Sequence, residues 1–241
     1  QGGIIDDLMI SNRGDHFFAV INASRKQIDF KYLKANISKE IDIDLISSRS
    51  LIAIQGPQSE KILSSQIGEL SSLNYLDVKN FFYNGEILWV SRSGYTGQDG
   101  FEISLPNSLC EVFCKTILDQ EGIEPIGLGA RDTLRLECGL CLYGQDLNET
   151  ITPIEAGLKW AIQKVRRTGG EREGGFTGHE KILVQIAVPP DFKREAFFPD
   201  GKAPLRSGTK LFSDDSGKNE IGLITSGSYS PTLERPISMG Y

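Results

Sequence analysis

The sequence predicts an α+β, or mixed α/β, domain followed by a small β-barrel or sandwich, and three observations predict it. Residues 16–139 alternate between apolar, β-rich runs and segments of helix-forming residues, a mixture typical of such domains. Residues 164–178 are charged and Gly-rich with almost no apolar content, as expected of an exposed connection. Beyond them, short apolar runs alternate with turn sequences, a pattern typical of small β domains.

In the first domain, strands are expected where a short apolar run ends at turn residues, and helices where helix formers follow a capping residue. The expected strands are 16–21, 51–54, 87–92 and 100–105. The expected helices are 22–33, with Asn22 or Ser24 as its cap, one from Ser59 onward, 109–118 and 129–139. Residues 93–99 contain two glycines, which allow the positive φ angles of a hairpin loop.

In the second domain, the strand-like runs are 182–188, 209–212 and 221–226. Turn sequences separate these runs, so each run predicts one strand of a small β-barrel or sandwich. We therefore divide the chain into a first domain at 1–163, a linker at 164–178 and a C-terminal β domain at 179–241.

Composition narrows the class of function. The 241 residues are 39% hydrophobic and 24% charged, as in ordinary globular proteins, and the net charge is −6. An acidic balance disfavours broad nucleic-acid binding, which needs clustered Lys and Arg to neutralise phosphates. No apolar run approaches the roughly 20 residues that a membrane-spanning helix needs. We expect neither a nucleic-acid nor a membrane partner, and four cysteines in a chain of this size indicate a reducing compartment.

The adjacent acids Asp6 and Asp7 are the first candidates for chemistry. They follow two glycines and an apolar pair and precede another apolar run. One interpretation is a turn that leads into a strand with both acids in solvent, which is the common state of carboxylates. The other is that a strand directs one acid into a pocket. Because adjacent strand residues face opposite sides, only one of the two can then point inward.

Two charged residues in regular elements are further candidates. Glu102 lies between Phe101 and Ile103 in an expected strand, so it faces away from the core. It meets either solvent or a second cavity, where a carboxylate can accept two hydrogen bonds from a heterocycle. Arg131 lies near the start of an expected helix and shares a face with Arg135. Because its charge opposes the helix dipole there, it needs a partner, either an anionic ligand or a buried acid.

The cysteines and histidines lack the spacing of a metal site. Cys138 and Cys141 have Cys-x-x-Cys spacing, but one such pair supplies at most half of a zinc site, and His16 and His179 are isolated. We expect two packed core thiols in preference to a redox pair. The Gly-rich segments fit neither the dinucleotide-binding pattern nor the P-loop pattern.

Taken in order, short motifs over nearly the whole chain resemble the T protein of the glycine cleavage system. The motifs are Gly-Gly-Ile-Ile-Asp-Asp-Leu (2–8), Val-Ile-Asn-Ala (20–23), Leu-Ile-Ala-Ile-Gln-Gly-Pro (51–57), Ser-Gly-Tyr-Thr-Gly-Gln-Asp-Gly-Phe-Glu-Ile (93–103), Gly-Ala-Arg-Asp-Thr-Leu-Arg-Leu-Glu (129–137), Gly-Leu-Cys-Leu-Tyr-Gly (139–144), Thr-Pro-Ile-Glu-Ala-Gly-Leu (152–158) and Ile-Thr-Ser-Gly (224–227). The arginine block at 129–137, together with 139–144 and 152–158, is the most specific part.

T proteins are folate-binding aminomethyltransferases, so the resemblance implies transfer of a one-carbon unit from the aminomethyl-lipoyl arm of H protein to tetrahydrofolate. Ammonia is released and 5,10-methylenetetrahydrofolate is formed. The implied partners are lipoylated H protein and tetrahydrofolate, the acceptor substrate, and neither a metal nor a covalent enzyme intermediate is required. The implied fold is a folate-binding mixed domain followed by a small C-terminal β-barrel.

The resemblance also assigns site residues. It places the key acid on Asp7 and the pterin or folate contacts on Glu102 and Arg131, while Asn22 and Tyr95 lie in matching motifs of the same pocket. A carboxylate can read the donors of a pterin ring in bidentate fashion, and an arginine can hold a carbonyl or an anionic part of folate. Asp7 can either orient the attacking amine and handle its proton, or stabilise the cation that forms as ammonia leaves; both roles stay open.

T proteins begin upstream of Gly2 and continue beyond Tyr241, so the resemblance implies that both domains are truncated in this sequence. It leaves two compartments, the bacterial cytoplasm and the mitochondrial matrix. Two other functional classes remain. A folate-dependent demethylase of the same superfamily would keep Glu102 but change the donor side. Non-enzymatic relatives in iron–sulfur assembly or tRNA modification carry a cysteine in the loop that corresponds to 93–98, and this chain has none there.

Overall fold

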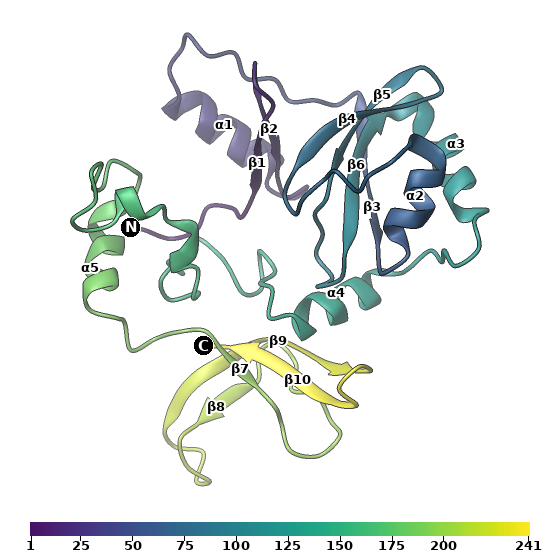
Figure 1. Ribbon diagram of the computed structural model, residues 1–241. Coiled ribbons are helices and arrows are strands. Elements are labelled where there is room, and N and C mark those ends of the chain that lie inside the picture. Colours follow the sequence, from purple (N-terminus) through teal and green to yellow (C-terminus); the bar gives the residue numbers. More distant parts are fainter. The chain divides into compact units, whose positions relative to one another are not determined.

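The computed structural model describes all residues 1–241 (Figure 1). Its contacts divide the chain into two compact units. Unit 1 comprises Gln1–Met9, Val20–Tyr32 and Gly139–Tyr241, and unit 2 comprises Ile10–Ala19 and Leu33–Cys138. Both units are therefore built from segments that are far apart in the sequence. No helix of the chain combines the length and the apolar character needed to span a lipid bilayer.

Unit 2 contains a four-stranded antiparallel sheet with the order β3-β6-β5-β4. The strands are β3 (Arg49–Gln55), β4 (Val78–Tyr83), β5 (Glu86–Ser91) and β6 (Gly100–Pro106), and the helices are α2 (Ser59–Ile67), α3 (Asn107–Leu118) and α4 (Leu128–Glu137). A separate pair of short strands, β1 (Met9–Asn12) and β2 (Phe17–Val20), precedes α1 (Lys26–Asn36). The sheet places β6 between β3 and β5, so Glu102 lies opposite both Ala53 and Ser91.

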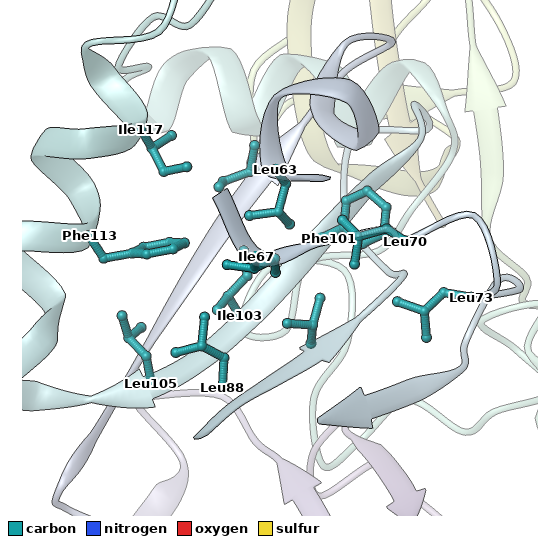
Figure 2. Packing of buried hydrophobic residues seen from close by; sticks show 12 residues of the cluster. Leu63, Ile67, Leu70, Leu73, Leu88, Phe101, Ile103, Leu105, Phe113 and Ile117 are labelled. Atoms are coloured by element: carbon teal, nitrogen blue, oxygen red, sulfur yellow. The ribbon is translucent and has the colours of Figure 1, made fainter. Parts of the chain in front are cut away.

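The core of unit 2 forms between this sheet and the helices α2 and α3 (Figure 2). Phe101 and Ile103 of β6 are fully buried there with Leu63 of α2 and Phe113 of α3. Burial of each such side chain stabilises the fold by roughly 1.5–3 kcal/mol. Because successive strand residues face opposite sides, the core positions of Phe101 and Ile103 turn Glu102 to the other face of the sheet, as the sequence predicts.

Unit 1 ends in a four-stranded antiparallel sheet with the order β7-β10-β9-β8. Its strands are β7 (Glu195–Phe197), β8 (Lys210–Phe212), β9 (Glu220–Ser230) and β10 (Arg235–Gly240); two 3₁₀ turns, Lys159–Ala161 and Lys164–Arg166, and the helix α5 (His179–Ala187) precede them. The buried carboxylate of Asp146 accepts hydrogen bonds from Ser226 Oγ, at 2.8 Å for its closer oxygen, and from the Leu142 N–H at 2.9 Å. These bonds tie β9 to an earlier loop of the same unit.

One expected strand is a helix. The run 182–188, expected as the first strand of the C-terminal β domain, lies mostly in α5. The buried positions of α5 are Ile182 and Gln185, and their separation of three residues fits a helical period rather than the alternation of a strand. The other two expected strands of this domain are present as β8 and β9.

The first expected helix begins later than the sequence predicts. Its first residue is Lys26, because the N–H groups of Ile28 and Asp29 both donate to the carbonyl oxygen of Arg25. Asn22 is therefore not the cap of this helix, and its side chain has other partners, described below. The remaining expected strands and helices of the first domain are present with ends shifted by a few residues.

Candidate functional site

The opening run 2–7 is held by a distant segment of unit 1. The Ile4 N–H donates to the carbonyl oxygen of Ile151 at 2.9 Å, and the Ile4 side chain is buried. A Cβ atom on Gly3 would lie 1.7 Å from the carbonyl oxygen of Glu149, a backbone atom that has little room to shift. Position 3 therefore requires glycine, and this close approach fixes where the acid pair begins.

Asp6 and Asp7 share one partner, the side chain of Asn22. Asn22 Nδ2 donates to Asp6 Oδ1 at 2.8 Å, to Asp7 Oδ1 at 2.7 Å and to the Asp7 carbonyl oxygen at 3.1 Å. The Asn22 N–H donates to Asp6 Oδ2 at 3.1 Å. Because an amide NH₂ group has only two hydrogens, the two acids engage both of them. We call Asp6, Asp7 and Asn22 the acid–amide cluster.

The expectation that only one acid of the pair points into a pocket loses its basis in the structure. It depends on strand geometry, but residues 1–8 lie outside any strand, and β1 begins at Met9. Without the alternation of a strand, the carboxylates of Asp6 and Asp7 reach the same amide. The cluster therefore contains two neighbouring carboxylates instead of one.

The pKa of Asp7 is raised above its ordinary value. The residue as a whole is exposed, but the protein around its carboxylate removes water from it, and this desolvation is the largest influence on the pKa. The hydrogen bond from Asn22 lowers the pKa, and the negative charge of Asp6 raises it. A carboxylate with a raised pKa takes up a proton more readily, which suits a group that handles protons in a reaction.

In unit 2, Glu102 is held by the hydroxyl of Ser93, which in turn contacts the hydroxyl of Ser91. Ser93 Oγ donates to Glu102 Oε2 at 2.6 Å, and Ser91 Oγ lies 2.8 Å from Ser93 Oγ. Ser93 is only 3% exposed, so water does not compete for this hydroxyl. A carboxylate accepts about four hydrogen bonds in total, so Glu102 is oriented by the serine and keeps capacity for the donors of a ligand.

The hairpin loop 93–99 is fixed by Gln55, the last residue of β3. Gln55 Nε2 donates to the carbonyl oxygen of Ser93 at 2.9 Å, and Gln55 Oε1 accepts from Thr96 Oγ1 at 3.0 Å. A Cβ atom on Gly94 would lie 1.8 Å from Gln55 Oε1. A larger residue at position 94 would therefore displace the glutamine side chain and break both bonds.

Arg131, near the start of α4, lies with its guanidinium carbon 4.8 Å from the centre of the Tyr95 ring. A cation at this distance is attracted by the ring. The sequence analysis predicts that the partner of Arg131 is either an anionic ligand or a buried acid. In the structure, no acid among residues 1–241 forms an ion pair with Arg131. Arg135 differs, because it is fully buried and donates to Asp132 Oδ1 through Nε at 2.8 Å and Nη2 at 2.7 Å.

The structure thus pairs four of the five predicted site residues with one another. It joins Asp7 to Asn22 in unit 1 and Tyr95 to Arg131 in unit 2. The fifth, Glu102, lies in unit 2 and has a serine as its partner.

Sequence reasoning misses the residues that hold Glu102 and its loop. Ser93 follows one expected strand and begins the hairpin loop, and Glu102 lies in the strand after that loop. The hairpin therefore indicates that these two residues can lie close together. Gln55 is the polar end of an apolar run, and nothing in its local sequence indicates a contact with a loop about 40 residues later.

The cysteines are all free, and one of them differs from expectation. Cys138, expected as a packed core thiol, is exposed, and its Sγ donates to the carbonyl oxygen of Thr96 at 3.5 Å. Cys141 is buried, as expected.

Comparisons with known proteins give the family. Residues 1–166 match the GCVT N-terminal domain, and residues 195–241 match the glycine cleavage T-protein C-terminal barrel domain. A probable mitochondrial aminomethyltransferase of Schizosaccharomyces pombe is 41% identical over all of this chain and 61% of its own length. A mitochondrial aminomethyltransferase of Pisum sativum is 43% identical over all of this chain and 60% of its own length. The chain therefore spans about three fifths of the length of these relatives.

A solved structure agrees with this result. The crystal structure of glycine cleavage system aminomethyltransferase T from Bartonella henselae matches all of this chain and 64% of that chain, with a TM-score of 0.88 and 36% sequence identity. The expected fold class, a T-protein-like mixed domain with a small C-terminal barrel, is confirmed. The chain belongs to the glycine cleavage T-protein family.

Proposed function

We propose that the protein transfers the one-carbon unit of an aminomethyl-lipoyl group on H protein to tetrahydrofolate. The observation that carries the proposal is the acid–amide cluster, in which one amide orients two adjacent carboxylates and the pKa of Asp7 is raised. The carbon leaves one sulfur and one nitrogen atom and becomes bonded to two nitrogen atoms of folate. This transfer needs a group that can hold a proton or a cation beside the reacting atoms, and a carboxylate can do both. Aminomethyltransferase relatives at 41–43% identity support this reaction.

The balance of the reaction shows what the acid has to do. The carbon–sulfur bond to lipoate and the carbon–nitrogen bond to the departing ammonia break, and two carbon–nitrogen bonds to folate form. The two N–H protons of folate end on ammonia and on the lipoyl thiol. The carbon keeps its oxidation state, so no redox partner is needed, and we propose that the reaction uses no metal. Asp7 either accepts a folate proton or stabilises the cation that forms as ammonia leaves.

We assign folate binding to residues of unit 2. The carboxylate of Glu102, oriented by Ser93 at 2.6 Å, would accept hydrogen bonds from the donors of the pterin ring. Arg131, which lies over Tyr95 and has no acidic partner in the chain, would hold a carbonyl or a carboxylate of folate. Asn22 is assigned to orienting the acids in unit 1, since all its described side-chain bonds go to Asp6 and Asp7.

The proposal extends to partners, compartment and domain limits. The partners are lipoylated H protein and tetrahydrofolate, with no role for nucleic acid. The relatives from Schizosaccharomyces pombe and Pisum sativum are both named as mitochondrial aminomethyltransferases. These names support the mitochondrial matrix over the bacterial cytoplasm as the compartment. The division into a folate-binding domain at 1–163, a linker at 164–178 and a barrel domain at 179–241 is part of the same proposal.

The direct test supplies the protein, as it occurs in the cell, with tetrahydrofolate and aminomethyl-lipoylated H protein. We expect methylenetetrahydrofolate and ammonia to appear in equal amounts. A parallel reaction replaces H protein with N-methyl amino acids and an electron acceptor, which a folate-dependent demethylase would use. Turnover only in the parallel reaction would overturn the assignment of the donor and leave the folate assignment standing.

A further inference from the structure

Asp29 is a buried acid that the proposed chemistry does not use. It lies in the first turn of α1 and is the one residue that this helix buries, with 3% exposure. Acids are rarely buried unless they are paired. Its Oδ2 atom is buried and has no hydrogen-bond donor among the residues of the chain. An ionised carboxylate in such a place would keep a large desolvation penalty.

A second carboxylate, that of Asp6, is the neighbour whose hydrogen bonding and negative charge raise the pKa of Asp29. Two carboxylates both accept hydrogen bonds when ionised, and a bond between them needs a proton on one of the two. A proton on Asp29 turns its carboxyl group into a donor to Asp6 and explains the absence of another donor. A hydrogen bond between these two acids therefore requires that they share one proton.

The other charged and titratable groups facing Asp29 do not replace that proton. Arg25 acts on Asp29 by its charge, but its Nη2 donates to Glu149 Oε1 at 2.6 Å, and its buried Nε has no partner. Tyr143 lies with its ring 5.1 Å from the Arg25 guanidinium carbon, and its hydroxyl donates to the carbonyl oxygen of Ile4. Neither contact supplies a donor to the buried oxygen of Asp29.

Asp6 connects this proton to the acid–amide cluster. Asp6 Oδ1 accepts from Asn22 Nδ2 at 2.8 Å, and Asp6 Oδ2 accepts from the Asn22 N–H at 3.1 Å. Asn22 Nδ2 in turn donates to Asp7 Oδ1 at 2.7 Å. The order of contacts is therefore Asp29, Asp6, Asn22 and Asp7, and each group restricts the orientation of the next.

We propose that Asp29 is a positioning residue, which carries a proton, donates it in a hydrogen bond to Asp6 and so orients Asn22 and the carboxylate of Asp7. The proposal rests on the proposed function, because Asp7 is taken as the reacting acid. Asp29 itself does not touch the substrates in this scheme.

Electrostatics agree with this geometry. Burial is the main cause that raises the pKa of Asp29, to about 6; the hydrogen bond and the negative charge of Asp6 raise it too, and Arg25 lowers it. Asp29 therefore loses its proton as the pH rises through about 6, and the donor to Asp6 is lost with it.

The kinetic test compares Asp29→Ala and Asp29→Asn. The alanine variant has no donor to Asp6, so we expect kcat to fall roughly 10- to 100-fold, the cost of a slightly misplaced catalytic group, with the dissociation constant of tetrahydrofolate unchanged. The asparagine amide can donate to Asp6 without a titratable proton, so it should recover most of the lost kcat. Because asparagine does not titrate, the ratio of kcat in Asp29→Asn to kcat in the wild type should rise between pH 5.5 and pH 8.

The control is Asp44→Asn, which removes an exposed acid outside every helix and strand and should leave kcat and its pH profile unchanged. An unchanged kcat in Asp29→Ala would overturn the proposal. So would an Asp29→Asn variant whose pH profile matches that of the wild type, an outcome that can be observed even if Asp29→Ala does not fold.

A second measurement does not depend on turnover, and so separates this proposal from the proposed function. Carboxyl ¹³C NMR of the wild-type protein should show Asp29 titrating near pH 6, and in Asp6→Asn its midpoint should move to lower pH. A midpoint that is the same in the wild type and Asp6→Asn would show that the two acids share no proton. Absence of aminomethyl transfer, with the NMR result as expected, would overturn the proposed function alone.

Discussion

The two units hold their predicted site carboxylates in different ways. In unit 1, Asp7 shares an amide with a second acid, and desolvation raises its pKa. In unit 2, Glu102 accepts a hydrogen bond from a buried hydroxyl that meets another hydroxyl. A carboxylate beside another carboxylate has a raised pKa and can change its protonation state more easily. A carboxylate that accepts a hydrogen bond from a neutral hydroxyl is suited to accepting further hydrogen bonds from a ligand. We expect changes in unit 1 to alter rate and changes in unit 2 to alter affinity.

The largest expected effect comes from Asp7→Asn. Removal of the acid should lower kcat by roughly 10²–10⁴-fold, the usual contribution of a general acid–base group, and leave folate binding in place. Single-turnover transfer from aminomethyl-lipoylated H protein measures the rate, and calorimetric titration with tetrahydrofolate measures binding. Turnover at the wild-type rate would remove Asp7 from the mechanism.

Folding stability should respond to pH through Asp29. Its folded-state pKa is about 6, above the ordinary value of 3.8, so its contribution to stability is full below 3.8 and is lost as pH rises through 6. The free energy of unfolding of the wild type, relative to Asp29→Asn, should therefore fall by roughly 2–3 kcal/mol across that window. Urea unfolding from pH 3.5 to pH 8 measures it, and a difference that stays constant with pH would contradict the shared proton.

In unit 2, Glu102→Ala and Arg131→Ala should weaken tetrahydrofolate binding by roughly 1.5–3 kcal/mol each, the usual worth of a hydrogen bond to a charged group. At saturating folate, kcat should change much less than in Asp7→Asn. Equilibrium binding and the separation of KM from kcat measure this difference. Unchanged affinity in both variants would mean that folate binds elsewhere.

The smallest expected effect is that of Ser93→Ala. It removes the hydroxyl that orients Glu102 and should weaken folate binding by roughly 1 kcal/mol, about fivefold, the net value of one hydrogen bond. Ser91→Ala is the matched control, because it removes a hydroxyl of the same pair that does not contact Glu102 in the structure, and its effect should be smaller. A larger loss in Ser91→Ala would reverse the assignment of the two serines.

The parts of the site that follow local rules can be predicted from the sequence. The face of Glu102 follows from the apolar residues on either side, because strand alternation is a local property. The hairpin 93–99 follows from its glycines and from the strands beside it. Helix α5 is misread because its β-branched run favours a strand, and only the burial of Ile182 and Gln185 at helical spacing decides the matter.

The acid–amide cluster depends on contacts that no local pattern contains. The opening run is placed by a bond from Ile4 to Ile151, far along the chain, so strand alternation does not apply to Asp6 and Asp7. Asn22 has the residue type of a helix cap, and its use by the two acids appears only in the folded chain. Asp29 looks like an ordinary acid on a polar helix, since the sequence does not show which face that helix buries.

The Gln55 side chain has a consequence for the motions of unit 2. Surface loops usually open with little free energy and exchange their amide hydrogens quickly. The loop 93–99 is bonded to Gln55 through Ser93 and Thr96, and Gly94 has no room for a side chain beside it. The loop can therefore open only when it separates from the end of β3. Its amide hydrogens should therefore exchange only when this edge of the sheet opens. Ser93, which orients Glu102, is thus carried on a loop as persistent as the strands it connects.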